Sequence, residues 1–238
     1  MNLLDLALIA VIIVSVILGA YRGFVVSALK TGSFFVSWIV AYLLHPLLSW
    51  VFSGQGTINA LINYTEGAAK LKIDTPLQMI TTPISQLDAA TLNGLATDSS
   101  LVSPYSTLVK SNMASQALAS KGLSTVGEYF NYTVAYATLN ILTFLAIFFL
   151  VRLLCGLLVN VTDATQRFPV LRHNDVLAGA LTGLLRGVFA CYIIMAFAPI
   201  VLSVLNVPLV TNYVLSAPLA GVFYKSNFIL LLMRGTVL

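Results

Sequence analysis

Charged side chains are scarce in this sequence. Only 8% of its 238 residues are Asp, Glu, Lys or Arg, whereas 59% are hydrophobic. A soluble domain carries roughly 25% charged residues, so eight acids and twelve bases are too few to give this chain a solvated surface. A lipid bilayer removes that requirement, because the outer surface of a membrane protein can be apolar. The composition therefore predicts an integral membrane protein and argues against a soluble enzyme.

Cysteine and histidine are also rare, with two of each in the chain. Cys155 and Cys191 lie in apolar stretches, and neither has a Cys or His at metal-ligand spacing. His45 and His173 are each isolated in the sequence. No Gly-rich phosphate loop, nucleophile elbow or paired-carboxylate motif is present. We therefore expect no metal, no cofactor and no enzymatic activity.

Four long apolar stretches, by contrast, are prominent. They cover residues 3–20, which only Asp5 and Ser15 interrupt, and residues 34–52, 129–151 and 188–206. Each has at least the roughly 18 residues that a helix needs to cross the hydrocarbon layer. The predicted fold class is therefore all-α, a polytopic membrane protein with about four transmembrane helices.

Composition divides the chain into four segments. Residues 1–52 are predicted to hold the first transmembrane pair, and residues 129–206 the second pair with a cytoplasmic connection. Residues 53–128 are richer in Ser, Thr, Asn and Gln, and the spacing of Leu, Ile and Met there favours short helices over strands. The tail, residues 207–238, is interpreted as interfacial, with a fifth span as the alternative.

The distribution of basic residues predicts the orientation. Six bases follow span one or lie between spans three and four: Arg22, Lys30, Arg152, Arg167, Arg172 and Arg186. Only Lys225 and Arg234, in the tail, are counted on the other side. Because short cytoplasmic connections carry the excess of Lys and Arg, both termini and the 53–128 loop are predicted to be extracytoplasmic. The bases are spread singly rather than in runs, so we expect no nucleic-acid partner.

Two segments repeat one pattern, small-x-x-x-Gly-x-x-Arg-Gly. They are residues 15–23 and residues 179–187, and an apolar pair follows each. Small residues four apart form a groove on one helix face, where another helix backbone can approach closely. The pattern predicts a helix-packing seam made of Ser15, Gly19, Gly23, Gly179, Gly183 and Gly187.

The arginines of the two repeats allow two interpretations. Arg22 and Arg186 could anchor the helices at the cytoplasmic headgroups, or they could line a polar site with Asp175. Asp175 could equally cap the helix that follows it. Asp5 completes the candidate polar site, although it is 17 residues from Arg22, about 25 Å along a helix, and cannot pair with it within one straight helix.

Asp5, the motif Arg22-Gly23-Phe24, and Asp175 followed by residues 179–187 together resemble the bacterial colicin V production (CvpA) membrane-protein family. The resemblance covers roughly residues 1–52 and 130–206. It implies a small protein of the bacterial cytoplasmic membrane that is linked to production of a toxin, and it implies no biochemical activity.

Two functional hypotheses follow. The first, which rests on the resemblance, is a membrane accessory to toxin production or export or to envelope maintenance, with an unidentified secretion or envelope partner. The second is a small oligomeric channel or transporter, because many transporters are built from repeats. Against it, the predicted spans hold almost no charge. The small-residue faces exceed what four helices need internally, which leaves a homo-oligomer open as a partner besides the lipid bilayer.

Overall fold

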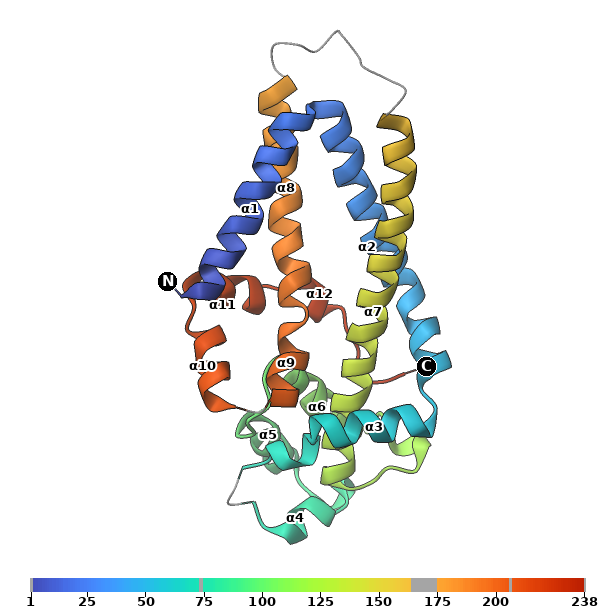
Figure 1. Ribbon diagram of the computed structural model, residues 1–238. Coiled ribbons are helices and arrows are strands. Elements are labelled where there is room, and N and C mark those ends of the chain that lie inside the picture. Colours follow the sequence, from blue (N-terminus) through green and yellow to red (C-terminus); the bar gives the residue numbers. More distant parts are fainter. Residues whose placement is uncertain (1, 73–74, 164–174, 206, 238) are drawn as a thin grey trace. The chain divides into compact units, whose positions relative to one another are not determined.

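The computed structural model describes residues 2–72, 75–163, 175–205 and 207–237 (Figure 1). Within these ranges the regular structure is helical, and the β-type pairing is one isolated antiparallel bridge between Pro83 and Thr125. This confirms the predicted all-α class.

Four helices are long and apolar enough to cross a membrane, as predicted. The longest elements are α1 (Leu3–Arg22), α2 (Phe24–Phe52), α7 (Val126–Asp163) and α8 (Asp175–Met195), which α9 (Ala198–Leu205) follows. The candidate spans are Leu3–Arg22, Phe24–Phe52, Val126–Leu158 and Asp175–Leu205. The described part of the chain therefore forms an all-α polytopic membrane protein.

The helices that contain the third and fourth predicted spans extend beyond the predicted ends at residues 151 and 188. The candidate span of α7 continues past Arg152 to Leu158, and the fourth span begins at Asp175, well before Arg186. Arginine is a good helix former, so a single one does not end an apolar helix. Both arginines therefore lie inside candidate spans rather than in a connection. Arg167, Arg172 and His173 lie outside the described residues.

Short helices fill the polar segment, in agreement with the spacing of its apolar residues. They are α3 (Gln55–Thr65), η1 (Gly67–Lys70), α4 (Leu77–Thr81), η2 (Ile84–Gln86), α5 (Ala89–Thr97), α6 (Tyr105–Ala114) and η3 (Ala119–Lys121). The tail forms α10 (Pro208–Leu215), α11 (Pro218–Lys225) and α12 (Phe228–Leu231). Residues 208–215 and 218–231 together have the length and composition of a span, but they form a bent pair, so they count as a fifth crossing only as a broken span.

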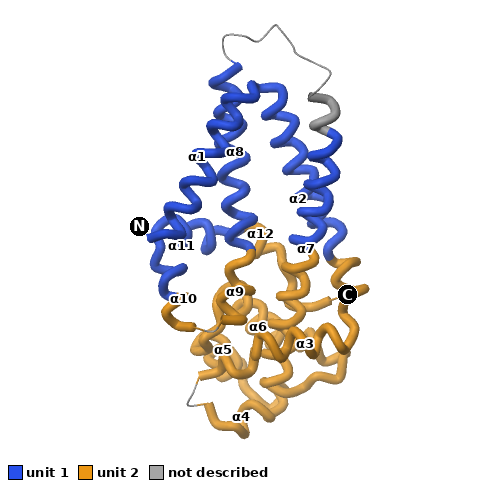
Figure 2. The backbone as a smooth tube through the Cα atoms, viewed as in Figure 1, with its two compact units in different colours: residues 1–45, 144–196, 212–227 blue, residues 46–143, 197–211, 228–238 orange. Residues whose placement is uncertain are grey.

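The chain divides into two compact units, each of which combines several of the segments suggested by composition (Figure 2). Unit 1 contains residues 1–45, 144–196 and 212–227. Its main helix pair is α1 and α8, and α11 packs on both. Edge-on aromatic contacts connect α2 to α7 and to α8. The ring centroids of Phe34 on α2 and Phe148 on α7 are 5.1 Å apart, and those of Phe35 on α2 and Phe189 on α8 are 4.7 Å apart.

Unit 2 contains residues 46–143, 197–211 and 228–238. Its core holds large, fully buried side chains, among them Tyr105, Met113, Leu118, Tyr129 and Phe130. The Tyr105 hydroxyl is 2.9 Å from that of Thr138 on α7, so this buried phenol has a hydrogen-bond partner. Within this unit α3 also packs against α9.

Candidate functional site

The two repeated segments pack against each other in unit 1. Gly19 lies against the backbone of Gly179 and Gly183, and Gly183 also lies against the backbone of Ser15. A Cβ on Gly187 would be 3.0 Å from the nearest α1 backbone atom. Residue numbers fall along α1 as they rise along α8, so the helices are antiparallel. The glycines therefore let two helix backbones touch, which is a contact that larger residues would prevent.

Short hydroxyl side chains bridge the same seam. Ser15 donates to the Gly183 carbonyl at 2.8 Å, and Ser27 of α2 donates to the Gly179 carbonyl at 3.3 Å. Thr182 donates in turn to the Ser27 hydroxyl at 2.7 Å. Each of these hydroxyls therefore has a hydrogen-bond partner inside the bundle, where burial of an unpaired polar group would cost free energy.

Gly23 and Asp175 meet where α1 turns into α2. Gly23 adopts a φ of 77°, which L side chains rarely adopt, and a Cβ there would collide with the Asp175 carboxylate. That carboxylate accepts a hydrogen bond from the Phe24 backbone N–H. Asp175 therefore caps the start of α2, a different helix from the one that follows it in the chain. The cap satisfies a donor that α2 leaves unpaired and complements the positive end of its dipole.

Asp5 does not join this site. It is fully buried, and one carboxylate oxygen accepts from the backbone N–H groups of Leu219 and Ala220 at 3.1 and 3.0 Å. The other oxygen accepts from the Asn2 N–H at 3.2 Å, within a capping box at the start of α1. Asp5 therefore joins the first turns of α1 and α11, which lie more than 200 residues apart in sequence.

Arg186 is bound to α1 rather than to a carboxylate. Its Nε donates to the Ser15 hydroxyl at 3.2 Å, and one terminal nitrogen donates to the Ser15 carbonyl at 3.4 Å. Since the Asp175 carboxylate caps α2, the structure does not bring Arg22, Arg186 and Asp175 together as an ion-paired site within the residues it describes. The Arg186 guanidinium instead donates two hydrogen bonds to Ser15 of the seam.

The register of the seam also gives the depth of Arg186. With 20 residues, α1 is about 30 Å long, the thickness of the hydrocarbon layer. Gly187 packs against Ile12, at the middle of α1, so the Arg186 backbone lies opposite the middle of that helix. Its side chain tilts towards the start of α8 and ends at Ser15, seven residues or about 10 Å short of Arg22. Arg22 lies at the exposed end of α1, whereas Arg186 contacts that helix further along its length.

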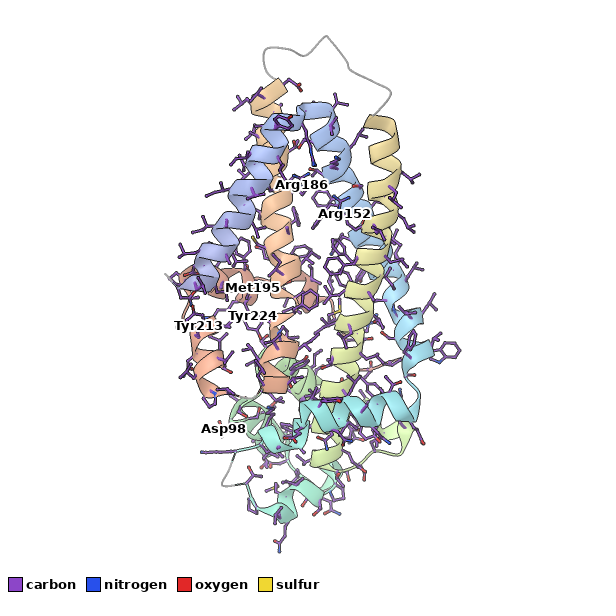
Figure 3. All side chains as sticks on the ribbon, viewed as in Figure 1. Asp98, Arg152, Arg186, Met195, Tyr213 and Tyr224 are labelled. Atoms are coloured by element: carbon purple, nitrogen blue, oxygen red, sulfur yellow. The ribbon has the colours of Figure 1, made fainter. Side chains whose placement is uncertain are left out.

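Arg152 is a site residue that the sequence analysis missed. It is half-buried, and its Nη1 donates to the Ser33 hydroxyl of α2 at 2.7 Å. Figure 3 shows Arg152 and Arg186 extending from α7 and α8 at a similar height in unit 1. The signal was available, because the chain after Arg152 resumes the apolar run Leu-Leu-Cys-Gly-Leu-Leu instead of turning polar. An apolar stretch on both sides of one arginine indicates a cation within a span.

Neither cysteine belongs to a metal centre in the described residues, where no group of three or more His, Cys, Asp or Glu lies close together. The buried Cys191 thiol lies 3.6 Å from the Leu8 carbonyl across the seam. His45 has Nδ1 2.8 Å from the Tyr42 carbonyl on its own helix.

Long apolar helices, a glycine-lined seam and two half-buried arginines within candidate spans define a helical integral membrane protein. A profile of the family described as "Colicin V production protein" matches residues 4–72 and 109–225, more than half of the chain. The protein therefore belongs to the colicin V production protein family. The match contains both repeated segments and extends into the tail, while residues 73–108 of the polar segment fall outside it. Comparisons with curated proteins and with solved structures give no match.

Proposed function

We propose that this protein is a non-enzymatic accessory protein of the bacterial cytoplasmic membrane that assists production or export of a small peptide toxin or maintains the envelope. Membership of the colicin V production protein family carries this proposal, since the match includes both repeated segments and the helices that hold them. The site agrees with a non-enzymatic role, because its polar groups are engaged in joining helices. Ser15 and Asp175, for example, bind backbone groups of neighbouring helices.

A small oligomeric channel or transporter is the second candidate, and one observation favours it. Arg152 and Arg186 lie within candidate spans, so these helices hold more charge than the spans predicted from the sequence. Ionisable groups at that depth commonly mark a substrate or ion route. Four helices are few for a pore, and this alternative therefore includes a homo-oligomer in the lipid bilayer.

Complementation of a deletion strain tests both candidates through Arg186. Arg186→Leu removes both donors to Ser15, whereas Arg186→Lys keeps the charge but lacks the planar fork. We expect Lys to restore toxin release or survival of osmotic stress only in part and Leu to fail, at matched amounts of protein in the membrane. Lys225→Gln, which changes an exposed base on α11, is the control and should restore function fully.

Solute flux separates the two candidates. Liposomes that contain only this protein should show no flux of ions or small anions if it is an accessory protein. Flux that Arg152→Gln and Arg186→Gln abolish, and that Lys225→Gln leaves unchanged, would establish the channel or transporter instead.

We also propose that both termini are extracytoplasmic. With Arg152 and Arg186 inside spans, four bases, Arg22, Lys30, Arg167 and Arg172, still stand against Lys225 and Arg234. Cysteines introduced at the exposed residues Asp98 and Ser226 should react with an impermeant reagent in intact cells, whereas one at exposed Tyr21 should react only after lysis. The reverse pattern would invert the orientation. The native cysteines are first replaced by alanine.

A further inference from the structure

Unit 1 contains a hollow of about 480 Å³ beside the end of α1. Three of its lining residues are basic, and the others are apolar or small: Arg22, Lys30, Phe149, Arg152, Leu153, Gly156 and Leu157. The bases come from three helices, since Arg22 ends α1, Lys30 lies on α2 and Arg152 lies on α7. The fold therefore brings Arg152 to the same cavity as Arg22 and Lys30, although it lies more than 100 residues from them in the sequence.

Among the described residues that line this hollow, three are basic and none is acidic. Two carboxylates of unit 1 have described positions. Asp175 caps α2, and Asp5 binds the first turn of α11 through Leu219 and Ala220. Both carboxylates accept hydrogen bonds from backbone N–H groups. An anion from outside the chain is therefore a suitable ligand for the guanidinium groups of Arg22 and Arg152.

We propose that this hollow binds a phosphate group, with Arg22, Lys30 and Arg152 as its cationic ligands. Arginine presents five N–H donors in a planar fork that matches phosphate oxygens, and lysine adds a compact charge. Arg152 gives one N–H to Ser33, which fixes the guanidinium and leaves its remaining donors for a ligand.

The apolar wall of the hollow favours the phosphate of an anionic membrane lipid over free inorganic phosphate. Phe149, Leu153 and Leu157 lie on one face of α7 at spacings of four residues, and Leu153 and Leu157 are 62% and 58% exposed. An acyl chain can lie along this face while the headgroup meets the bases. Arg22 lies at the end of its span, where the headgroups of an anionic leaflet would be.

Ligand-dependent thermal stability of the purified full-length protein tests this site. The probes, added in a neutral detergent, are short-chain phosphatidylglycerol, short-chain phosphatidylcholine and inorganic phosphate. A ligand that binds only the folded protein raises its unfolding temperature in proportion to occupancy, which yields an apparent Kd. We expect phosphatidylglycerol to bind most tightly, and Arg22→Gln and Lys30→Gln each to weaken it roughly tenfold. Lys225→Gln, which removes a base of unit 1 outside the hollow, should leave the affinity unchanged.

The possible outcomes are distinct. Tighter binding of phosphatidylglycerol than of inorganic phosphate, lost in the two variants, supports a lipid phosphate as the ligand. Equal or tighter binding of inorganic phosphate, with the same loss, supports the site with a free phosphate as its source. Absence of binding by both anions, or equal affinities in Arg22→Gln, Lys30→Gln and Lys225→Gln, overturns the proposal. If one variant fails to fold, the other decides, because each removes a different cation of the same hollow. If both fail, the wild-type protein decides: tighter binding of phosphatidylglycerol than of net-neutral phosphatidylcholine supports the cationic site, and equal affinities for the two lipids overturn it.

Discussion

The two units satisfy their buried polar groups by different means. In unit 1 the side chains of the seam are short, and Ser15, Ser27 and Thr182 reach carbonyls and hydroxyls that glycine has already brought close. In unit 2 asparagine and lysine side chains also reach across to backbone without regular structure. Asn140, for instance, donates to the carbonyls of Arg234 and Thr236 at 2.7 and 3.0 Å.

The difference follows from the backbone that each unit must pack. Two regular helices leave few unpaired backbone groups along their length, so in lipid their association depends on close contact and van der Waals attraction. A tail without regular structure leaves carbonyls unpaired, and each buried one needs a donor. Asn112, Asn140 and Lys121 supply such donors to residues 234–237 of unit 2. Substitutions that add bulk should therefore damage unit 1 most, and substitutions that remove a donor should damage unit 2 most.

The largest effect is expected from bulk in the seam. Gly183→Leu places a side chain where the Ser15 backbone lies, so the helices must separate, and we expect a loss of roughly 3 kcal/mol or more in the free energy of unfolding. Leu184→Ala, at the adjacent and 42% exposed position, is the control and should cost much less. The measurement is reversible unfolding in mixed micelles. Equal tolerance of the two changes would contradict the backbone contact.

A smaller effect is expected from removal of a donor in unit 2. Asn140→Ala leaves two tail carbonyls without their partner, and we expect a loss of about 2 kcal/mol. Asn93→Ala changes an exposed asparagine of the same unit and should be nearly neutral. Proteolysis near the C-terminus provides a second measurement, since Asn140→Ala should expose the tail before the rest of unit 2 unfolds. An unchanged cleavage rate would show that the tail is held in another way.

The helices and the seam could be predicted from the sequence because they depend on long apolar stretches and on small residues at regular spacing. Apolar length predicts a span, and small residues four apart lie on one helix face, so Gly179 and Gly183 could be assigned to a packing surface before any partner was known. The antiparallel register was not accessible, because a repeated pattern does not state whether its copies pair with each other.

The polar contacts were harder to predict because they depend on tertiary structure. Nothing near Asp5 in the sequence indicates that its partners are Leu219 and Ala220. Asp175 was assigned to its own helix or to an arginine, and it caps α2 instead. Arg152 and Arg186 were taken as span ends because a charge within a bilayer is costly, and serines on neighbouring helices, out of reach of local reasoning, offset that cost.

The smallest expected effect concerns Lys70 of unit 2, whose Nζ donates to the Ser203 carbonyl in the last turn of α9 at 3.0 Å. Burial lowers the pKa of Lys70 below its ordinary value, and the nearby charge of Glu66 opposes that shift only in part. Because the folded pKa is below the unfolded one, the unfolded state binds more protons between the two values. Stability should therefore rise with pH from the folded pKa up to the ordinary value of 10.5.

Replacement of this lysine isolates its contribution to the pH dependence. Lys70→Met removes the titrating group, so its free energy of unfolding should rise less steeply with alkaline pH than that of the wild type, by at most about 1.4 kcal/mol per pH unit for one proton. Lys72→Met, at an exposed position two residues away, should keep the wild-type slope. The hydrogen bond to Ser203 is also lost in Lys70→Met, which shifts the whole curve but does not alter its slope. Parallel curves for the wild type and Lys70→Met would mean that the ammonium group is as well solvated in the folded protein as in the unfolded chain.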